Sequence, residues 1–323
     1  MFHGQELCRT EFTVTQRVAS PQMGLPLGQG TEESTLGIGN RLTLLDDQLL
    51  ENLHKVQLGN GLAPSSTLAS GDFTVEMETG TGKTYVYLRT IFELHKRYGF
   101  AKFVIVVPSV AIKEGVYKSL EITAEHFREL YSGTPFEYFI YDSAKLGQVR
   151  NFASSPNIQV MVITVAAINK FGDEDAAAEE ESDDIKRREK SKNVMYRASE
   201  KTGGERPIDL IRATRPILIV DEPQSVDGGI DGKGRKALEH MHPLCTLRYS
   251  ATHADKHHMV YRLDAIDAYE QKLTVIATES FEQFPTARRR VVGQSRPKPE
   301  RRCASAMERR LILGIPMRQT AGR

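Results

Sequence analysis

The sequence predicts an α/β fold with a mainly parallel sheet, and two observations support this prediction. From about residue 71, short apolar runs alternate with longer segments whose apolar residues recur at helical spacing. Several runs, among them KFVIVV at 102–107 and PILIV at 216–220, are continuously apolar, which is typical of strands covered on both faces. We therefore expect about five strands with intervening helices, forming one domain at 71–280.

Residues 1–70 are predicted to lead into this domain. They contain a β-rich piece, EFTVTQRV at 11–18, followed by a glycine- and proline-bearing loop at 20–30. In the stretch 42–58, apolar residues recur three and four positions apart, which predicts one face of a helix. These residues are Leu42, Leu45, Leu49, Leu53 and Val56.

The domain at 71–280 is expected to begin with a strand–loop–helix–strand unit. FTVEM at 73–77 precedes a Gly/Thr-rich turn, TYVYLRTIFELHKRYG at 84–99 has helical spacing, and KFVIVVP at 102–108 follows. The other expected strands are FEYFIY (136–141), IQVMVITVAAI (158–168), PILIVDE (216–222) and TLRYSAT (246–252).

Charge is distributed unevenly, although the formal net charge of the whole chain is only +1. Nine acidic and five basic residues at 173–192 predict a charged surface insertion without chemistry. Residues 286–323 carry ten Arg and one Lys against two Glu. We expect the tail at 281–323 to be disordered, and a nucleic-acid-binding arm is the alternative.

The cysteines and the absence of long apolar runs restrict the class of protein. Cys8, Cys245 and Cys303 lie far apart and form no CxxC pair, which excludes a zinc ribbon and a disulfide-stapled secreted module. The N-terminus has no signal-peptide pattern, and no run of about 18 apolar residues occurs. The expectation is a soluble, cytoplasmic protein with no membrane partner.

A phosphate-binding loop is predicted between the first expected strand of the domain and its helix. Glycines in such a loop let backbone N–H groups approach phosphates, the lysine reaches the β/γ-phosphates, and the following threonine can ligate Mg²⁺. The strict pattern would begin with glycine where this chain has Met77, a departure common in helicase-type loops. The loop residues, predicted to bind ATP, are Thr79, Gly80, Thr81, Gly82, Lys83 and Thr84.

A pair of carboxylates ends the apolar run PILIV. Asp221 is predicted to hold Mg²⁺, and Glu222 to orient and deprotonate an attacking water. Water as the nucleophile would mean nucleotide hydrolysis. About thirty residues later, the hydroxyls of Ser250 and Thr252 follow another expected strand and are candidates for coupling nucleotide state to a bound strand.

In this order, TGTGKT, VPSVAIKEGV, DEPQSVD and YSATH resemble motifs I, Ia, II and III of superfamily 2 helicases. With the linking sequence around them, the chain is similar to the restriction (Res) subunit of type III restriction–modification enzymes, from about Glu11 to Thr274. The resemblance implies a RecA-like P-loop NTPase lobe, the first motor lobe of such an enzyme. It also implies ATP and Mg²⁺ as cofactors, and double-stranded DNA and a methyltransferase (Mod) subunit as partners. In the intact enzyme, ATP-dependent translocation or switching would be coupled to DNA cleavage.

The resemblance assigns roles to particular residues. Lys83, the loop glycines and Thr84 would bind the phosphates and magnesium. Asp221 would hold the metal, and Glu222 would activate the water. Gln224 would contact the nucleotide or the neighbouring motif, and Ser250 and Thr252 would couple ATP to DNA. Pro108, Ser109 and Lys113, in VPSVAIK, would touch the DNA backbone.

Two departures from the family pattern lead to further expectations. After about residue 274 the sequence has no pattern of a second RecA-like lobe or of a nuclease domain, so a truncated Res subunit is predicted. The adenine-recognising glutamine of the family has no clear counterpart, with Gln5 and Gln16 as candidates. The alternatives to an ATP-hydrolysing motor are a non-catalytic module that binds DNA or a partner, and another superfamily 2 ATPase.

Overall fold

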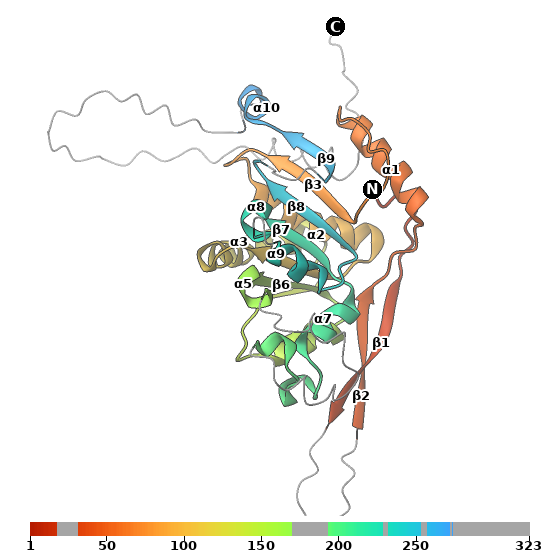
Figure 1. Ribbon diagram of the computed structural model, residues 1–323, viewed down its shortest axis with the longest axis vertical. Helices are drawn as coiled ribbons and strands as arrows, with labels where there is room; N and C mark the ends of the chain where they lie inside the picture. The colour runs from red at the N-terminus through yellow and green to blue at the C-terminus, as the bar shows by residue number, and fades with distance from the viewer. Residues whose placement is uncertain (18–31, 170–192, 229–231, 253–256, 272, 274–323) are drawn as a thin grey trace, which may run out of the picture.

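A seven-stranded parallel sheet forms the centre of the protein. The computed structural model describes residues 1–17, 32–169, 193–228, 232–252, 257–271 and 273, so the predicted insertion at 173–192 and tail at 281–323 lie outside the described residues. The strand order is β5-β6-β4-β7-β8-β3-β9 (Figure 1). The strands are β3 (Asp72–Met77), β4 (Lys102–Val107), β5 (Phe136–Ile140), β6 (Ile158–Thr164), β7 (Ile217–Asp221), β8 (Cys245–Ser250) and β9 (His258–Leu263).

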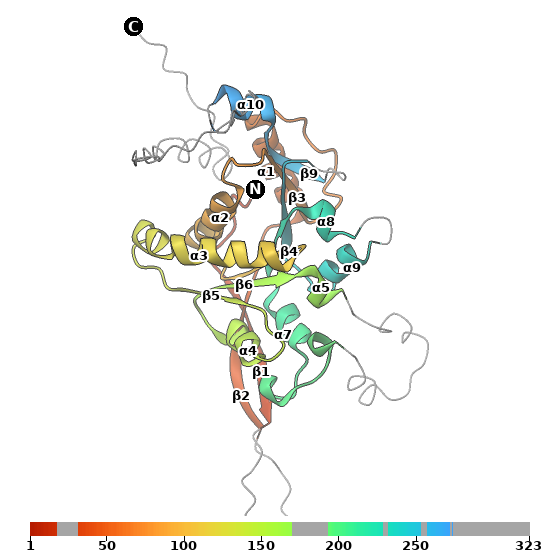
Figure 2. The same cartoon turned by 90° about the vertical axis from the view of Figure 1, so that its left-hand side faces the viewer.

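Helices cover both faces of this sheet (Figure 1, Figure 2). One face is packed by α1 (Asp46–Gly59), α2 (Lys83–Tyr98) and α3 (Val110–Leu130). The opposite face is packed by α4 (Gly147–Ser154), α5 (Val165–Ile168), α7 (Pro207–Thr214), α8 (Pro223–Val226) and α9 (Lys233–Glu239). Short 3₁₀ turns lie at η2 (Val194–Tyr196) and η3 (Glu200–Thr202), and α10 (Ala265–Glu270) follows β9. The arrangement confirms the α/β fold class predicted from the sequence.

Alternate residues of the central strands enter opposite cores. In β4, Phe103, Ile105 and Val107 belong to the core beneath α1, α2 and α3, whereas Val104 and Val106 belong to the core on the other face. All six residues of β4 are buried. Burial on both faces explains why residues 103–107 of this strand are apolar without alternation. The exception is Lys102 at its start, a buried lysine.

The described residues that precede β3 contact the sheet and its helices. β1 (Arg9–Arg17) and β2 (Glu32–Asn40) pair antiparallel. The Asn40 amide ties this hairpin to the sheet, because its Nδ2 donates to the Lys102 carbonyl at 2.8 Å and its Oδ1 accepts from the Ala101 N–H at 2.8 Å. The predicted helix is confirmed as α1, but it begins at Asp46, so that Leu42 and Leu45 precede it.

The sheet differs from the sequence-based expectation in two respects, and its strand order, which was not predicted from the sequence, is a third finding. β9 is an additional strand, and because HMVYRL mixes polar with apolar residues at the sheet edge, it lacks the continuous apolar run used as the signal. The expected strand at 158–168 ends at Thr164, and Val165–Ile168 form α5 instead. Finally, β3 and β4 are not neighbours, because β7 and β8 lie between them.

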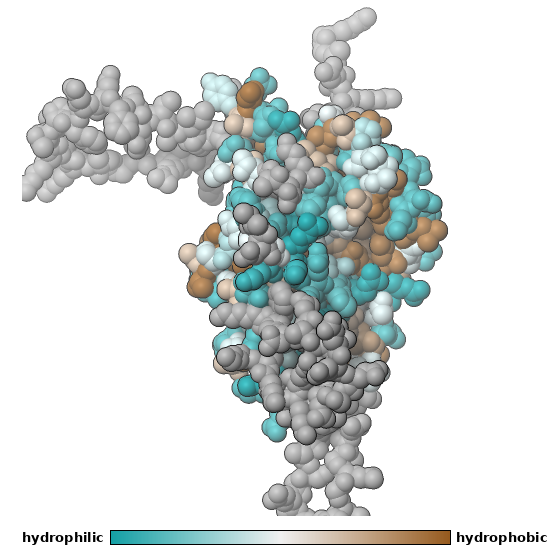
Figure 3. Space-filling model, in the orientation of Figure 1, coloured by the Kyte–Doolittle hydropathy of each residue, from teal (hydrophilic) through white to brown (hydrophobic). Residues whose placement is uncertain are grey.

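The described surface is mixed in polarity. In the view of Figure 3, hydrophilic residues cover most of the centre of the described surface and hydrophobic residues gather near α1, where Leu45 and Leu58 are exposed. In the described part of the chain, no helix combines the length and the apolar composition of a membrane span.

Candidate active site

The strand order brings the three predicted motifs to one edge of the sheet. β3, β7 and β8 run parallel, so their carboxyl ends share an edge, which is where ligands bind in open α/β sheets. The loop at 79–84 follows β3, Asp221 ends β7 and Ser250 ends β8. Because β8 lies between β7 and β3, Ser250 is placed between the other two motifs.

The loop after β3 is shaped to receive an anion. Gly80 and Gly82 have φ values of 79° and 90°, a region that residues with side chains disfavour, and Gly82 is the N-cap of α2. A Cβ built at either glycine would meet no heavy atom within 4 Å, so the backbone is open on that side. Thr81 steadies the turn, since its Oγ1 donates to the Glu78 carbonyl at 2.6 Å. An open glycine backbone at a helix N-terminus fits the predicted phosphate site.

Lys83 and Glu222 form an ion pair across the site. Nζ of Lys83, the first residue of α2, lies 3.1 Å from Oε1 of Glu222, and their side chains are 12% and 30% exposed. From the sequence, Lys83 was predicted to contact the phosphates and Glu222 the attacking water. In the structure the two side chains contact each other.

The pKa values of the adjacent carboxyls of Asp221 and Glu222 are shifted in opposite directions. Burial, with a smaller contribution from the charge of Glu222, raises the pKa of Asp221 to about 6. Burial alone would also raise the pKa of Glu222, but the hydrogen bond and charge of Lys83, with further hydrogen bonds from Ser250 and Gln224, hold it below its usual value. Glu222 is therefore ionised at neutral pH, as a general base must be.

Tyr87 is a residue of this site that sequence reasoning missed. Its ring is fully buried, and its hydroxyl donates to Oδ2 of Asp221 at 3.4 Å. Burial raises the pKa of this phenol well above its usual value, so Tyr87 is a neutral donor. A sequence signal existed, because Tyr87 lies four residues after Lys83 and thus on the same face of α2.

The shift at Asp221 predicts a pH dependence of stability. Because the folded protein holds this proton more tightly than the unfolded chain, the free energy of unfolding should fall as pH rises from about 4 to about 6. Compared with Asp221→Asn, the wild type should lose roughly 2 kcal/mol of stability between about pH 4 and pH 7. Denaturant unfolding of both proteins across this range measures the difference, and parallel pH profiles would contradict the assignment.

Ser250 and Gln224 complete the contacts around Glu222. The Ser250 hydroxyl lies 3.0 Å from Oε2 of Glu222 and 2.9 Å from Oε1 of Gln224, and its single proton can be donated to one of them at a time. Nε2 of Gln224 donates to Oε2 of Glu222 at 2.6 Å. Thr252 is exposed and is linked through its backbone N–H, which donates to the Ser250 hydroxyl at 3.3 Å. Ser250 thus lies at the contact between the YSATH and DEPQ motifs, whereas the Thr252 side chain lies on the surface.

Pro108, Ser109 and Lys113 lie where β4 leads into α3. The Ser109 hydroxyl accepts from the Ile112 N–H at 3.3 Å and caps the helix. The Lys113 N–H donates to the Ser109 carbonyl at 3.0 Å, and its Nζ lies 3.7 Å from Oε1 of Glu114. The amides of Ile112 and Lys113 are therefore already bonded, both to Ser109. A role of this segment in DNA contact stays a prediction.

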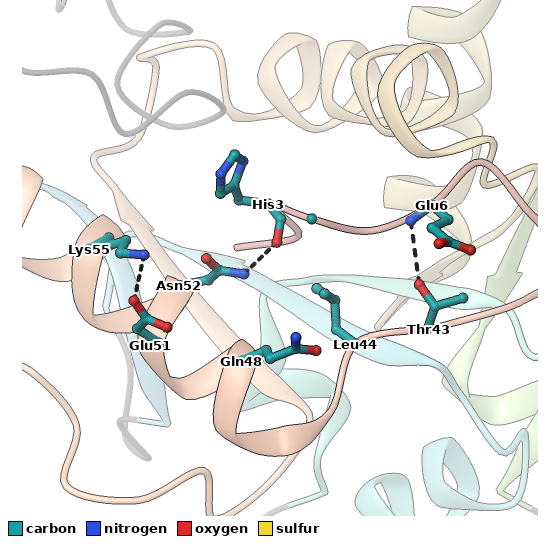
Figure 4. A pocket seen from close by; sticks show the side chains of 9 residues that line it. His3, Glu6, Thr43, Leu44, Gln48, Glu51, Asn52 and Lys55 are labelled. Atoms are coloured by element: carbon teal, nitrogen blue, oxygen red, sulfur yellow. Dashed lines mark hydrogen bonds and ion pairs between the residues drawn. The ribbon is translucent and has the colours of Figure 1, made fainter.

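A hollow of about 500 Å³ lies elsewhere, between the N-terminal segment and α1 (Figure 4). Its polar groups satisfy one another, with Lys55 2.7 Å from Glu51 and Asn52 donating to the His3 carbonyl at 2.8 Å. The neighbouring Phe2 packs on Tyr98, at the end of α2 opposite Lys83. This hollow is therefore remote from the predicted site.

The glutamine candidates for adenine recognition have no supporting geometry. Gln5 is buried, and its Oε1 accepts from the Thr43 N–H at 2.9 Å while its Nε2 donates to the Arg41 carbonyl at 3.0 Å. Gln5 is therefore committed to holding the segment that precedes α1. The side chain of Gln16 lies outside the described residues.

The residues at the site fit a magnesium ion that arrives with nucleotide. Among the described residues, no three His, Cys, Asp or Glu side chains are grouped as in a metal site built by protein alone. Mg²⁺ is usually held by one or two carboxylates together with substrate phosphates. Asp221 at the end of β7 and the hydroxyl of Thr84 in α2 are suitable for this minimal set.

The sequence of this chain matches a known protein family over most of its length. The family model of the type III restriction enzyme, res subunit, matches residues 47–255, which is more than half of the chain and includes all the motifs described above. The protein belongs to the type III Res subunit family. The resemblance to this family that was noted from the sequence is therefore confirmed.

Curated relatives agree with this assignment. The chain is similar to the EcoP15I Res subunit of Escherichia coli, with 32% identity over 247 residues that cover 72% of this chain and 24% of the relative. It is 30% identical to the EcoPI Res subunit of Escherichia phage P1, over 73% of this chain and 24% of that protein. The Res-family chain described here thus spans about a quarter of the length of these relatives.

A solved structure with a detectable likeness is the SWI2/SNF2 ATPase core of Sulfolobus solfataricus in complex with double-stranded DNA. The match has a TM-score of 0.33 and 13% identity, and covers 63% of this chain and 31% of that one. A likeness this distant carries no information about the ligands of the Res-family chain.

Proposed function

We propose that this chain is the ATP-binding and ATP-hydrolysing lobe of a type III Res subunit, acting on double-stranded DNA together with a Mod subunit. The observation that carries the proposal is the meeting of Lys83, the Asp221-Glu222 pair and Ser250 at the carboxyl edge of one parallel sheet. Family membership supports the same conclusion. Translocation or switching on DNA, coupled to cleavage, belongs to the intact enzyme in this proposal.

The residues of the site have separable roles in hydrolysis. The glycine backbone and Lys83 would bind the β- and γ-phosphates of the substrate ATP, and Asp221 with Thr84 would hold Mg²⁺, which supplies positive charge against the γ-phosphate. Glu222 is ionised and would orient and deprotonate the attacking water. Since Lys83 contacts Glu222 directly in this structure, binding of phosphate would have to compete with that ion pair.

Slow turnover is expected for the chain alone. Motors of this superfamily complete the ATP site with arginines from a second lobe, and the described residues contain one parallel sheet of this kind. Such arginines contribute on the order of 10³-fold or more to the rate. Nucleotide binding is thus expected of this chain by itself, whereas rapid turnover needs arginines from a second lobe.

The purified chain provides the test. Binding of a fluorescent ATP analogue should depend on Mg²⁺, and single-turnover hydrolysis with protein in excess should be slow but above background, with and without double-stranded DNA. Binding without any hydrolysis would favour the non-catalytic module. Absence of Mg²⁺-dependent nucleotide binding would contradict the proposed function.

A further inference from the structure

Arg248, in the strand that carries Ser250, is a buried cation with two carboxylate partners. Its side chain is 3% exposed. Nε lies 3.0 Å from Oδ1 of Asp72, and one terminal nitrogen lies 2.8 and 2.9 Å from the two carboxylate oxygens of Asp227. Buried charges of this kind are stable only with such partners, since an unpaired guanidinium in the interior is strongly unfavourable.

The two partners belong to different parts of the site. Asp72 begins β3, five residues before the strand ends at the phosphate-binding loop. Asp227 follows α8, the single helical turn that begins directly after Glu222 and contains Gln224. Arg248 therefore connects the strand of the phosphate loop, the strand of Ser250 and the segment that carries the general base.

The α8 turn depends on tertiary contacts for its position. A four-residue helix has no independent stability, because too few hydrogen bonds form to offset the cost of nucleation. Its start is held by Ser250, through Glu222 and Gln224, and its end by Arg248, through Asp227. Arg248 and Ser250 lie two residues apart in β8 and hence on the same face of the sheet.

Packing on the far side leaves α8 little room to shift. A Cβ placed on Gly234 of α9 would lie 1.7 Å from the Val226 carbonyl oxygen, so the two backbones are in close contact. Val226 itself is 1% exposed. The charged groups near the guanidinium also include Arg235 and Glu239, which pair with each other at 3.4 Å, and His257. In the described structure, none of these three side chains forms a hydrogen bond or ion pair with α8. The Arg248–Asp227 contact is therefore the polar side-chain attachment at the C-terminal end of α8.

We propose that Arg248 is a positioning residue for the Glu222–Gln224 segment, acting through its bidentate contact with Asp227. The start of the segment is fixed to β8 by the Ser250 hydroxyl and by the Glu222 N–H, which donates to the Tyr249 carbonyl at 3.0 Å. Arg248 fixes its end, so that the general base keeps one orientation relative to the phosphate loop. The positioning itself is a property of the nucleotide-free fold, and only its consequence for turnover rests on the proposed function.

The two carboxylates around Arg248 provide a matched pair of variants. Asp227→Asn and Asp72→Asn each remove one negative charge from the same guanidinium, and both keep the shape of the side chain. Only Asp227 is attached to α8, so only Asp227→Asn should loosen it. A purely structural role of the cluster would instead make the two variants equivalent.

Hydrogen exchange of the nucleotide-free chain, followed by mass spectrometry, provides the decisive measurement. In Asp227→Asn, the amides of Ser225, Val226 and Asp227, which donate to Glu222 and Pro223 carbonyls, should exchange about 10-fold faster than in the wild type. In Asp72→Asn they should exchange at the wild-type rate. The amides of β4 serve as an internal reference for global unfolding, because this strand is buried on both faces.

Kinetics provide a second readout where turnover is measurable. Asp227→Asn should lower the single-turnover rate about 10-fold and leave the affinity for the ATP analogue within about 3-fold, because only the orientation of the base changes. Unchanged exchange at 225–227 in Asp227→Asn, or equal acceleration in both variants, would overturn the positioning role. Faster exchange in a chain that binds no nucleotide would support the positioning and contradict the proposed function alone.

Discussion

Glu222→Gln is expected to lower the single-turnover rate of ATP hydrolysis at least about 100-fold, because general-base catalysis typically contributes 10²- to 10⁴-fold. Glutamine keeps the shape of the side chain and can still contact Ser250 and Gln224, which lie 3.0 and 2.6 Å from Oε2. It cannot accept the proton of water. Affinity for the ATP analogue should not fall, because activation of the water occurs only in the transition state. It should rise modestly if anything, since a neutral glutamine weakens the contact with Lys83 with which phosphate competes.

The control for this variant is Glu114→Gln. Glu114 is also a glutamate facing a lysine, with Oε1 3.7 Å from Nζ of Lys113, but its side chain is 60% exposed and lies on α3. The Glu114→Gln variant should leave both the single-turnover rate and the affinity for the ATP analogue unchanged. Retention of the wild-type rate in Glu222→Gln would remove Glu222 from the role of base.

Lys83→Ala is expected to weaken binding of the ATP analogue by about 100-fold and to reduce hydrolysis to background. The lysine is the sole side-chain cation of the phosphate-binding loop, and a hydrogen-bonded charge of this kind is worth about 2 to 4 kcal/mol toward a phosphate anion. Titration of the analogue with the variant, at constant Mg²⁺, measures the loss. The effect differs from that of Glu222→Gln because binding itself is lost.

The loss of Lys83 should also be visible without nucleotide. Its charge and hydrogen bond hold the pKa of Glu222 down, and its charge also lowers the pKa of Asp221. Both carboxyls should therefore titrate at higher pH in Lys83→Ala than in the wild type. Lys118→Ala is the matched control, since Lys118 is 68% exposed and pairs with Glu121 at 2.9 Å on α3. Equal analogue binding by Lys83→Ala and Lys118→Ala would contradict the assignment of the phosphate loop.

Local pattern was sufficient to locate most of the site. Glycine spacing in 79–84 and the position of Lys83 are properties of a continuous segment, and so is the placement of Asp221-Glu222 after an apolar run. The expected strands are present, and in β4, β6 and β7 burial on both faces leaves a mainly apolar run in the sequence. Only one residue of β5 is buried, and its sequence, FEYFI, is interrupted by Glu137. The predictions were wrong where two local signals overlap, as at 158–168, where apolar α5 directly follows apolar β6.

Sequence by itself thus determined the fold class, the family motifs and the chemical type of most of the site residues, with Tyr87 and Arg248 as the exceptions. Tertiary structure alone decided which of them meet. The order of strands depends on how helices pack across the sheet, and no local periodicity encodes that β8 lies between β7 and β3. This order sets Ser250 against Glu222, and side-chain packing in three dimensions brings Lys83 to Glu222, Tyr87 to Asp221, and Arg248 to both Asp72 and Asp227. These contacts join residues 21 to 176 positions apart, and such pairs are formed by burial of the whole sheet rather than by any one segment.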